Sequence, residues 1–288
     1  MGIQEAYTQL MYQLFELYDD RESANIADWT IEHITGFKRI DRITNKQFPL
    51  SISQQELLKT YTEELLQHKP VQYVLNEAWF AGIQFYVDEN VLIPRPETEE
   101  LVGWIVDESQ KSKVKSQKVL DIGTGSGCIP VALKKKLPEL DVYALDVSED
   151  ALNVAKKNAS EQKVTITFFQ TDILDKSKWN SLPKFDIIVS NPPYIKQSEE
   201  KEMRGNVLIH EPHLALFVPD EDALLFYKTI AEFGLQHLNK DGRLYFEINE
   251  IMGNKVKELL EQKSYSNIEV KKDMQGKDRM VRATLTSR

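Results

Sequence analysis

From about residue 98 onward, short apolar segments with the character of strands alternate with segments of helical spacing. Strands are predicted at 118–122, 142–147, 166–171, 185–190, 243–248, 268–272 and 279–285, and helices at 127–136, 149–159, 222–238 and 253–262. Strands joined through helices pair in parallel, because the crossover helix must lie on a face of the sheet. The alternation therefore predicts an α/β fold with an open, mostly parallel sheet covered by helices on both faces.

Residues 1–74 have a different pattern, that of a small helical bundle. Apolar residues recur at helical spacing in 3–17, in 26–34 and in 57–66, and Gly36 follows the second of these segments. Ser53 and Glu56 have the spacing of a capping box, which predicts the start of the third helix. Pro70 is expected to end that helix, because proline cannot continue it.

Between these two regions, residues 75–97 contain alternating aromatic and β-branched residues around a glycine and a later Asp-Glu-Asn turn. This pattern predicts a hairpin linker. We therefore expect a helical domain at 1–74, a linker at 75–97 and an α/β domain at 98–288. The helical domain carries no visible chemistry, so we expect it to dock the substrate.

Charge and cysteine content limit the class of protein. The chain has 288 residues, a net charge of −9 and a single cysteine, Cys128, which excludes an internal disulfide and a cysteine-based zinc site. No apolar run approaches the roughly 18 residues of a membrane span, and the amino terminus lacks the basic region of a signal peptide. We expect a monomer in the cytoplasm with no membrane partner. The acidic balance disfavours nucleic acid as a partner.

The stretch VLDIGTGSGCIPVAL runs from a predicted strand through a glycine-rich loop into a helix. Gly123, Gly125 and Gly127 allow tight turning and let a ligand approach the backbone. Asp146 ends the next predicted strand, where a carboxylate accepts hydrogen bonds from both hydroxyls of a ribose. These features predict a nucleoside site at the carboxyl ends of the strands.

The spacing of the loop discriminates between cofactors. A dinucleotide fingerprint reads G-x-G-x-x-G and holds a pyrophosphate at the helix amino terminus. Here the spacing is G-x-G-x-G and Asp121 precedes it. A carboxylate repels a pyrophosphate and pairs with a cation. S-adenosylmethionine has a ribose, an adenine, an ammonium and a sulfonium but no phosphate, so the loop favours it. Asp172, after the third strand, is expected near the adenine edge, with a surface turn as the alternative.

Residues 187–195, IIVSNPPYI, close a predicted strand with two residues that lack a backbone N–H. Pro192 and Pro193 fix a corner that presents acceptors, namely the side-chain oxygen of Asn191 and nearby carbonyls. Two rigid acceptors orient a planar NH₂ group, and Tyr194 offers a flat apolar face. The corner predicts methyl transfer to an amide or aromatic amine, with acceptors placed for a pyramidal nitrogen in the transition state.

The segment IHEPHLALF contains a weaker pattern of possible metal ligands. His210, Glu211 and His213 lie close together in sequence, but no further cluster accompanies them. Such residues are more often ordinary loop residues, so no metal site is expected. Cys128, after the glycine loop, is expected to pack in the interior.

Taken together, LDIGTGSG, ALDVS and IVSNPPYI resemble a class I S-adenosylmethionine-dependent amino-methyltransferase of the N-P-P-Y type. That type includes adenine-N6 DNA methyltransferases and glutamine-N5 protein methyltransferases. The longer stretches PVQYVLNEAWFAGIQFYVDENVLIPRPETEELV, EPHLALF, LYFEINEIMG and KDMQGKDRMV resemble the HemK/PrmC family of release factor glutamine methyltransferases. The resemblance covers most of the chain from about residue 70 onward.

This resemblance implies a class I, Rossmann-like methyltransferase fold with a mixed seven-stranded sheet. It also implies methylation of the glutamine in the Gly-Gly-Gln tripeptide of class I peptide chain release factors. The residues that would bind S-adenosylmethionine are Asp121, Gly123, Thr124, Gly125, Ser126, Gly127, Asp146, Asp172, Ile173 and Asn191. Those that would hold the glutamine amide are Asn191, Pro192, Pro193 and Tyr194, with Asn191, Pro192 and Tyr194 as catalytic residues.

Three further positions follow from the resemblance. The RPETE segment, Arg95 to Glu99, is expected near the site as a structural or lid segment without a chemical role. Family members often have glycine where Asn76 stands, which affects the linker turn. Some have tryptophan where Ile173 stands, and isoleucine packs on an adenine ring but does not stack with it.

Two other functions remain open at this point. An adenine methyltransferase of DNA or RNA would use the same acceptor corner on a flipped base, although the acidic charge and the lack of a basic recognition domain argue against it. A non-enzymatic docking module would keep the fold only as a scaffold. The combination of an intact glycine loop, Asp146 and the acceptor corner disfavours that reading.

Overall fold

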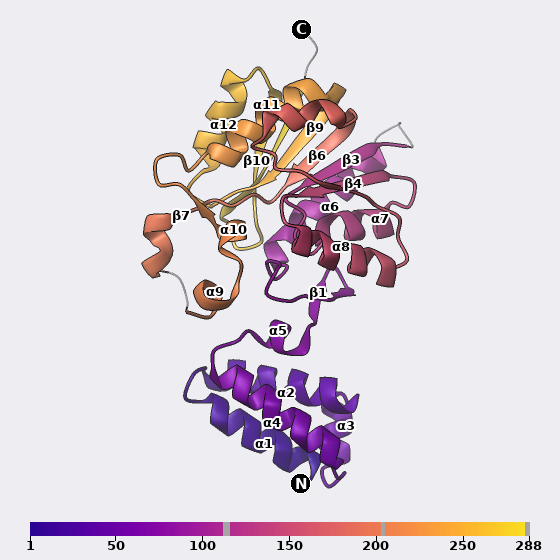
Figure 1. Cartoon of the computed structure of the whole chain (residues 1–288), viewed down its shortest axis with the longest axis vertical. Coiled ribbons are helices and arrows are strands. Elements are labelled where there is room, and N and C mark those ends of the chain that lie inside the picture. Colours follow the sequence, from indigo (N-terminus) through magenta and orange to yellow (C-terminus); the bar gives the residue numbers. More distant parts are fainter. Residues whose placement is uncertain (112–115, 203–204, 286–288) are drawn as a thin grey trace. The chain divides into compact units, whose positions relative to one another are not determined.

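The computed structural model describes residues 1–111, 116–202 and 205–285, and the chain divides into two compact units (Figure 1). The first unit comprises Met1–Glu77 together with helix α9 (Gly205–His210). The second comprises the described residues of Ala78–Met203 and Glu211–Arg288. No helix among the described residues is long and apolar enough to cross a membrane.

The first unit is a helical bundle, as predicted. Its other helices are α1 (Ile3–Leu14), α2 (Asp20–Thr35), α3 (Arg39–Thr44), α4 (Ile52–Leu66) and α5 (Val71–Leu75). Figure 1 shows α1, α2 and α4 side by side, and their apolar faces meet in one core that includes Leu10, Ile31 and Leu65. Each of these side chains is at most 1% exposed, so the unit has a core of its own.

Helix ends in this unit agree with the sequence only in part. Helix α2 ends as predicted at Gly36, which adopts the left-handed conformation with φ of 73°. The capping box predicted at Ser53 is wrong. Ser51 Oγ accepts from the Gln54 amide at 3.2 Å, and Gln54 Oε1 accepts from the Ser51 amide at 2.9 Å. The S-x-x-Q pair two residues upstream satisfies the same rule and adds residues to the helix.

The other two predicted helix ends also differ. Helix α1 ends at Leu14 and not at Leu17. Helix α4 ends at Leu66, before the residue His68 with φ of 63°, and Pro70 instead caps the start of α5. Proline has no N–H to lose at a helix start, so this position suits it better than the end of the preceding helix.

A hairpin follows α5, as predicted, but it is short. Strands β1 (Ala78–Phe80) and β2 (Ile83–Phe85) pair antiparallel, and both turn residues, Ala81 and Gly82, have positive φ. Asn76 caps α5 in the left-handed conformation, with φ of 52°. Because asparagine tolerates the left-handed conformation better than most residues other than glycine, Asn76 fits this cap.

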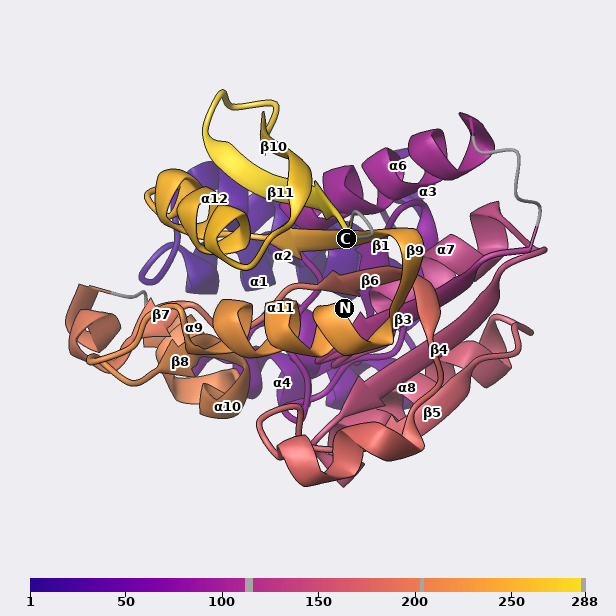
Figure 2. The same ribbon diagram turned by 90° about the horizontal axis from the view of Figure 1, so that it is seen from above.

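The second unit is built on a mixed seven-stranded sheet, which confirms the predicted fold class. In sheet order the strands are β10 (Ser266–Lys272), β11 (Asp278–Thr284), β9 (Leu238–Glu247), β6 (Phe185–Ser190), β3 (Lys118–Ile122), β4 (Asp141–Asp146) and β5 (Thr167–Gln170). Figure 2 shows β9, β6, β3, β4 and β5 next to one another in that order. These five are parallel, and β11 runs antiparallel to both of its neighbours.

Helices cover both faces of this sheet. Helices α11 (Leu225–His237) and α12 (Gly253–Gln262) share one core with Leu120 and Phe246. Helices α6 (Pro96–Lys111) and α7 (Cys128–Lys136) share the other with Val119, and α8 (Glu149–Glu161) contacts α7. Because successive residues of a strand face opposite sides, Val119 and Leu120 enter different cores.

Short elements complete this unit, and the sequence did not predict them. They are η1 (Lys176–Ser181), β7 (Ile195–Lys196), η2 (Gln197–Glu202), α10 (His213–Leu216) and β8 (Phe217–Val218). Strands β7 and β8 pair in parallel with only two residues each. Elements this short carry too little periodicity to be read from sequence.

Candidate active site

A cavity of about 230 Å³ lies at the carboxyl ends of the parallel strands. Residues 90–92, 145–148, 171–174 and 190–193 line it, together with Ile122, Gly123, Gly125, Ala151, Pro212, Leu214, Ala215, Phe226 and Ile230. Strands β3 and β6 are neighbours, and β4 lies on the far side of β3. The chain order therefore reverses at β3, which is the place where open α/β sheets bind ligands.

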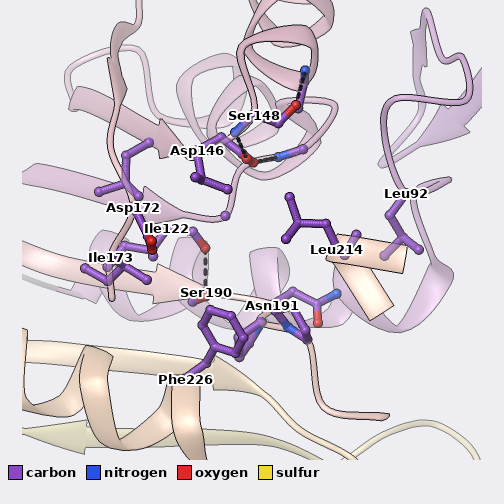
Figure 3. A pocket seen from close by; sticks show the side chains of 18 of the residues that line it. Leu92, Ile122, Asp146, Ser148, Asp172, Ile173, Ser190, Asn191, Leu214 and Phe226 are labelled. Carbon is purple, nitrogen blue, oxygen red and sulfur yellow. Dashed lines mark hydrogen bonds between the residues drawn. The ribbon is translucent and has the colours of Figure 1, made fainter. Parts of the chain in front are cut away.

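Asp146 is the last residue of β4, and its carboxylate is fixed by two backbone amides. Oδ2 accepts from the Gly125 amide at 2.9 Å, and Oδ1 accepts from the Ser148 amide at 3.0 Å (Figure 3). Burial raises the pKa of Asp146, and these hydrogen bonds partly oppose that rise. A carboxylate offers about four lone-pair directions, so both oxygens keep acceptor capacity for a ligand in the cavity.

The three glycines of the loop have two different tasks. Gly123, Gly125 and Gly127 all have positive φ, at 73°, 51° and 76°. A Cβ at Gly123 or Gly125 would meet nothing within 4 Å, and both glycines line the cavity. A Cβ at Gly127 would lie 3.0 Å from the Cβ of Ala155 on α8. The first two glycines thus leave room for a ligand, whereas the third lets α7 approach α8 closely.

Alanine at Gly127 is therefore expected to destabilise the fold. The side chain would require a left-handed conformation and would press on Ala155, which together cost roughly 2 kcal/mol or more. Urea denaturation measures the loss. Gly36→Ala is the matched control, because Gly36 has φ of 73° with nothing within 4 Å of the added Cβ. Equal losses for the two variants would show that contact with α8 adds nothing.

Several residues predicted to bind the cofactor do not line the cavity. Asp121, Thr124 and Ser126 are 1%, 5% and 2% exposed, and neither they nor Gly127 line the cavity. Burial raises the pKa of Asp121 to about 7, although the Thr124 hydroxyl lowers it in part. Neither carboxylate oxygen of Asp121 makes a hydrogen bond of standard geometry with a described residue.

The acceptor corner follows β6 and lines the cavity through Asn191, Pro192 and Pro193. The Ser190 hydroxyl donates to the Ile122 carbonyl at 2.7 Å and so ties the ends of β6 and β3 together (Figure 3). Tyr194 differs from the prediction. It does not line the cavity, and its ring packs against the core on the α11 side of the sheet. Its direction is set by that apolar surface, which the sequence motif does not contain.

The loop after β5 brings Asp172 and Ile173 to the cavity. Asp172 Oδ1 accepts from the Leu174 amide at 2.8 Å, so part of its capacity serves the turn. Ile173 is 5% exposed, and its carbonyl accepts from the indole N–H of Trp179 at 2.9 Å. At this position the wall is therefore aliphatic.

Other residues of the site were missed from sequence. Phe226 on α11 and Leu214 on α10 add apolar surface to the wall, as Figure 3 shows. A segment before α6 also contributes indirectly. Arg95 pairs with the buried Glu211 at 2.6 Å, which anchors the chain next to Pro212. Arg95 and Glu211 are separated by 116 residues, and only the fold brings the RPETE and EPHLALF segments together.

The charge of the cavity matches a cation better than a phosphate. Its described lining includes the carboxylates Asp146 and Asp172 and no lysine or arginine. Within the described residues, no three or more histidine, cysteine, aspartate or glutamate side chains gather as a metal site would require. The cavity combines exposed glycine backbone, a carboxylate placed to bind ribose hydroxyls and an aliphatic wall. These features fit a nucleoside that carries positive charge, and S-adenosylmethionine is such a molecule.

Comparison with known proteins decides the family. Family models match at residues 5–75, for a PrmC N-terminal domain, and at residues 105–218, for a methyltransferase small domain. A release factor glutamine methyltransferase of Flavobacterium psychrophilum is 46% identical over 98% of this chain and 99% of its own. One of Bacteroides thetaiotaomicron is 42% identical over 94% and 95%.

The chain belongs to the release factor glutamine methyltransferase family. Solved structures agree on the fold of this family member. A methyltransferase from Pyrococcus furiosus aligns with a TM-score of 0.52 at 18% identity, covering 80% of this chain and all of that one. The hMettl16 catalytic domain in complex with MAT2A 3′UTR hairpin 6 aligns with a TM-score of 0.55 at 17% identity, covering 82% of each chain.

Proposed function

We propose that this protein transfers a methyl group from S-adenosylmethionine to the side-chain amide nitrogen of the glutamine in the Gly-Gly-Gln motif of class I peptide chain release factors. Membership of the family, at 46% identity over almost the whole chain, carries the choice of reaction. The cavity supports it, because a glycine-walled nucleoside site and an acceptor corner adjoin one another there.

S-adenosylmethionine, when bound, supplies an electrophilic methyl group on a sulfonium. The glutamine nitrogen forms the new N–C bond as the C–S bond breaks, and S-adenosylhomocysteine leaves with both bonding electrons. The amide nitrogen then loses one proton to solvent. Asp146 would hold the ribose hydroxyls, and Gly123 and Gly125 would give the ligand access to the backbone.

Asn191 would supply the catalytic effect. An amide nitrogen is a poor nucleophile, because its lone pair is delocalised into the carbonyl. The Asn191 oxygen and a carbonyl of the Pro192 corner would accept hydrogen bonds from the two N–H groups of the substrate amide as its nitrogen becomes pyramidal. These hydrogen bonds favour the transition state over the planar ground state. Holding nitrogen and methyl in line at roughly 3–3.5 Å contributes the rest.

The first unit would dock the release factor. It has its own core and leaves several large apolar side chains exposed, among them Tyr12 at 60%, Ile40 at 65% and Ile52 at 78%. Covering such exposed apolar side chains with a protein partner is favourable, because it removes apolar surface from water. The proposed partners are thus release factors, and the compartment is the cytoplasm, where translation termination takes place.

Removal of residues 1–70 tests this docking. We expect kcat/KM on an intact release factor to fall by at least about tenfold, which corresponds to about 1.4 kcal/mol of docking energy. Transfer to a short Gly-Gly-Gln peptide and the Kd of S-adenosylmethionine should stay within about threefold of the full chain. Circular dichroism checks that the shortened protein is folded. Equal losses on the peptide and on the intact factor would refute docking.

A substrate comparison tests the reaction itself. Purified protein, labelled S-adenosylmethionine and either unmodified release factor or unmethylated duplex DNA are incubated side by side. Label on the release factor supports the proposal. Label on DNA would replace it with an adenine methyltransferase, which uses the same kind of acceptor corner.

A further inference from the structure

Three segments far apart in sequence meet behind Asn191. Thr98 lies in the first turn of α6, and Glu247 is the last residue of β9. The Thr98 hydroxyl donates to Glu247 Oε2 at 2.6 Å, and Asn191 Nδ2 donates to the Thr98 oxygen at 3.3 Å. Thr98 is 3% exposed and Glu247 is 2% exposed. A buried carboxylate thus connects to the acceptor corner through one hydroxyl.

The direction of the hydrogen bonds that run from Asn191 through Thr98 to Glu247 is determined at Glu247. An ionised carboxylate only accepts hydrogen bonds, so the Thr98 hydroxyl must donate its single hydrogen bond to Glu247. The Thr98 oxygen then has only lone pairs to offer, and it can meet Asn191 only through the NH₂ edge of that amide. The oxygen edge of Asn191 is left for another donor. Without such a chain the two edges of an asparagine amide are nearly isosteric and either can face a substrate.

We propose that Thr98 and Glu247 are positioning residues that fix the orientation of the Asn191 amide, so that its oxygen and not its NH₂ group meets the substrate nitrogen. The proposal rests on the proposed function for the identity of that substrate, a glutamine side-chain amide. A reversed amide would point a donor at the NH₂ of the substrate, where two donors repel. The RPETE segment thereby gains a role that its sequence did not suggest.

The protonation state of Glu247 controls the direction of these hydrogen bonds. Burial raises the pKa of Glu247 to about 7, while the hydrogen bond from Thr98 and the charge of Arg279 lower it in part. Below that pH the carboxyl group is protonated and can itself donate to Thr98. The Thr98 hydroxyl is then free to donate to the Asn191 oxygen, which reverses the direction of both hydrogen bonds. The productive orientation is therefore expected above about pH 7 and lost below it.

Other ionisable groups act on or near this site. Those that interact with Glu247 are Arg95, Glu97, Cys128, Tyr194, Tyr227 and Arg279. Burial raises the pKa of Cys128 and of Tyr194 to about 12, and it raises the pKa of Tyr227 well above its usual value, so these three stay protonated between pH 6 and 9. Asp121 has a pKa of about 7 as well. A comparison of variants therefore has to separate its protonation from that of Glu247.

Substitutions at Thr98 test the geometry in the full-length protein. At pH 8 and saturating S-adenosylmethionine, Thr98→Val should lower kcat on release factor by roughly 10- to 100-fold. Its Kd for S-adenosylmethionine should stay within about threefold, because Thr98 does not line the cavity. Thr98→Ser keeps the hydroxyl and should restore most of the rate. The matched control is Thr229→Val, which removes the hydroxyl of another buried threonine, on α11 of the second unit, and Thr229 does not line the cavity.

Substitution of Glu247 tests the direction. Wild-type kcat should fall as pH drops through about 7, and Glu247→Gln should remove the part of that fall due to Glu247. An unchanged acidic limb in Glu247→Gln, or a Thr98→Val enzyme with a kcat within about threefold of wild type, would overturn the proposal. Melting temperatures of all variants show whether a loss reflects unfolding.

A readout without turnover separates this inference from the proposed function. The side-chain NH₂ signals of Asn191 in ¹⁵N NMR should shift with a midpoint near pH 7 in the wild type and in Asp121→Asn. They should show no such shift in Thr98→Val. Shifts that persist in Thr98→Val would contradict the proposal whatever the substrate is, whereas failure of wild-type protein to methylate release factor contradicts only the proposed function.

Discussion

Asn191→Ala is expected to lower methyl transfer to release factor by at least about 100-fold, the scale for loss of one group that stabilises a transition state. The Kd of S-adenosylmethionine should remain within about threefold of wild type, since Asp146, Gly123 and Gly125 are unchanged. The physical reason is that the Asn191 oxygen is needed only when the substrate nitrogen becomes pyramidal. Single-turnover kinetics at saturating cofactor measure this effect.

Two companion variants sharpen the interpretation of this result. Asn180→Ala, at an exposed position in η1, should behave like the wild type. Asn191→Asp keeps an acceptor but cannot donate to Thr98, so an intermediate rate is expected. An Asn191→Ala enzyme with nearly normal single-turnover rates would refute the acceptor corner as the catalytic element.

Asp146→Ala is expected to weaken S-adenosylmethionine binding by roughly 10- to 100-fold, because hydrogen bonds to a charged group contribute about 1.5–3 kcal/mol. The variant also leaves the amides of Gly125 and Ser148 without their acceptor, which loosens the glycine loop. Isothermal titration calorimetry measures the Kd. Saturating cofactor should recover much of the turnover.

Asp172→Ala is the natural comparison, because Asp172 also lines the cavity and already accepts from the Leu174 amide. Its Kd should change less than that of Asp146→Ala. If Asp172→Ala weakened binding more than Asp146→Ala did, the principal ribose contact would have to be reassigned.

The central strands of the sheet in the second unit were predictable because they are short apolar runs. The runs predicted at 185–190 and 118–122 coincide with β6 and β3. The structure pairs these two strands in parallel, so the motifs that follow them lie at the same carboxyl edge of the sheet. Elements of two residues, such as β7, leave no such pattern in the sequence.

The candidate site was predictable where a motif is local in sequence. Gly123, Gly125 and Asn191 carry their own signal, and the structure brings them to one cavity with Asp146. Tyr194 belongs to the same motif, yet its ring follows the apolar core. The side chain of a motif residue is directed by its tertiary surroundings, which the motif alone does not contain.

Long-range contacts explain what was missed. Thr98 and Glu247 are separated by 149 residues, and nothing in either local sequence predicts their hydrogen bond. Arg95 and Glu211 are separated by 116 residues. Buried polar side chains of this kind require partners, but only the fold shows which partners they have.

The position of the transferred methyl group is the decisive measurement for the proposed glutamine methylation. Full-length protein is incubated with isotopically labelled S-adenosylmethionine and unmodified release factor, and the labelled peptide is fragmented by mass spectrometry. We expect one methyl group on the side-chain nitrogen of the Gly-Gly-Gln glutamine and none on a release factor in which that glutamine is replaced by alanine. Label on any other residue, or equal label on the alanine variant, would contradict the proposed methylation.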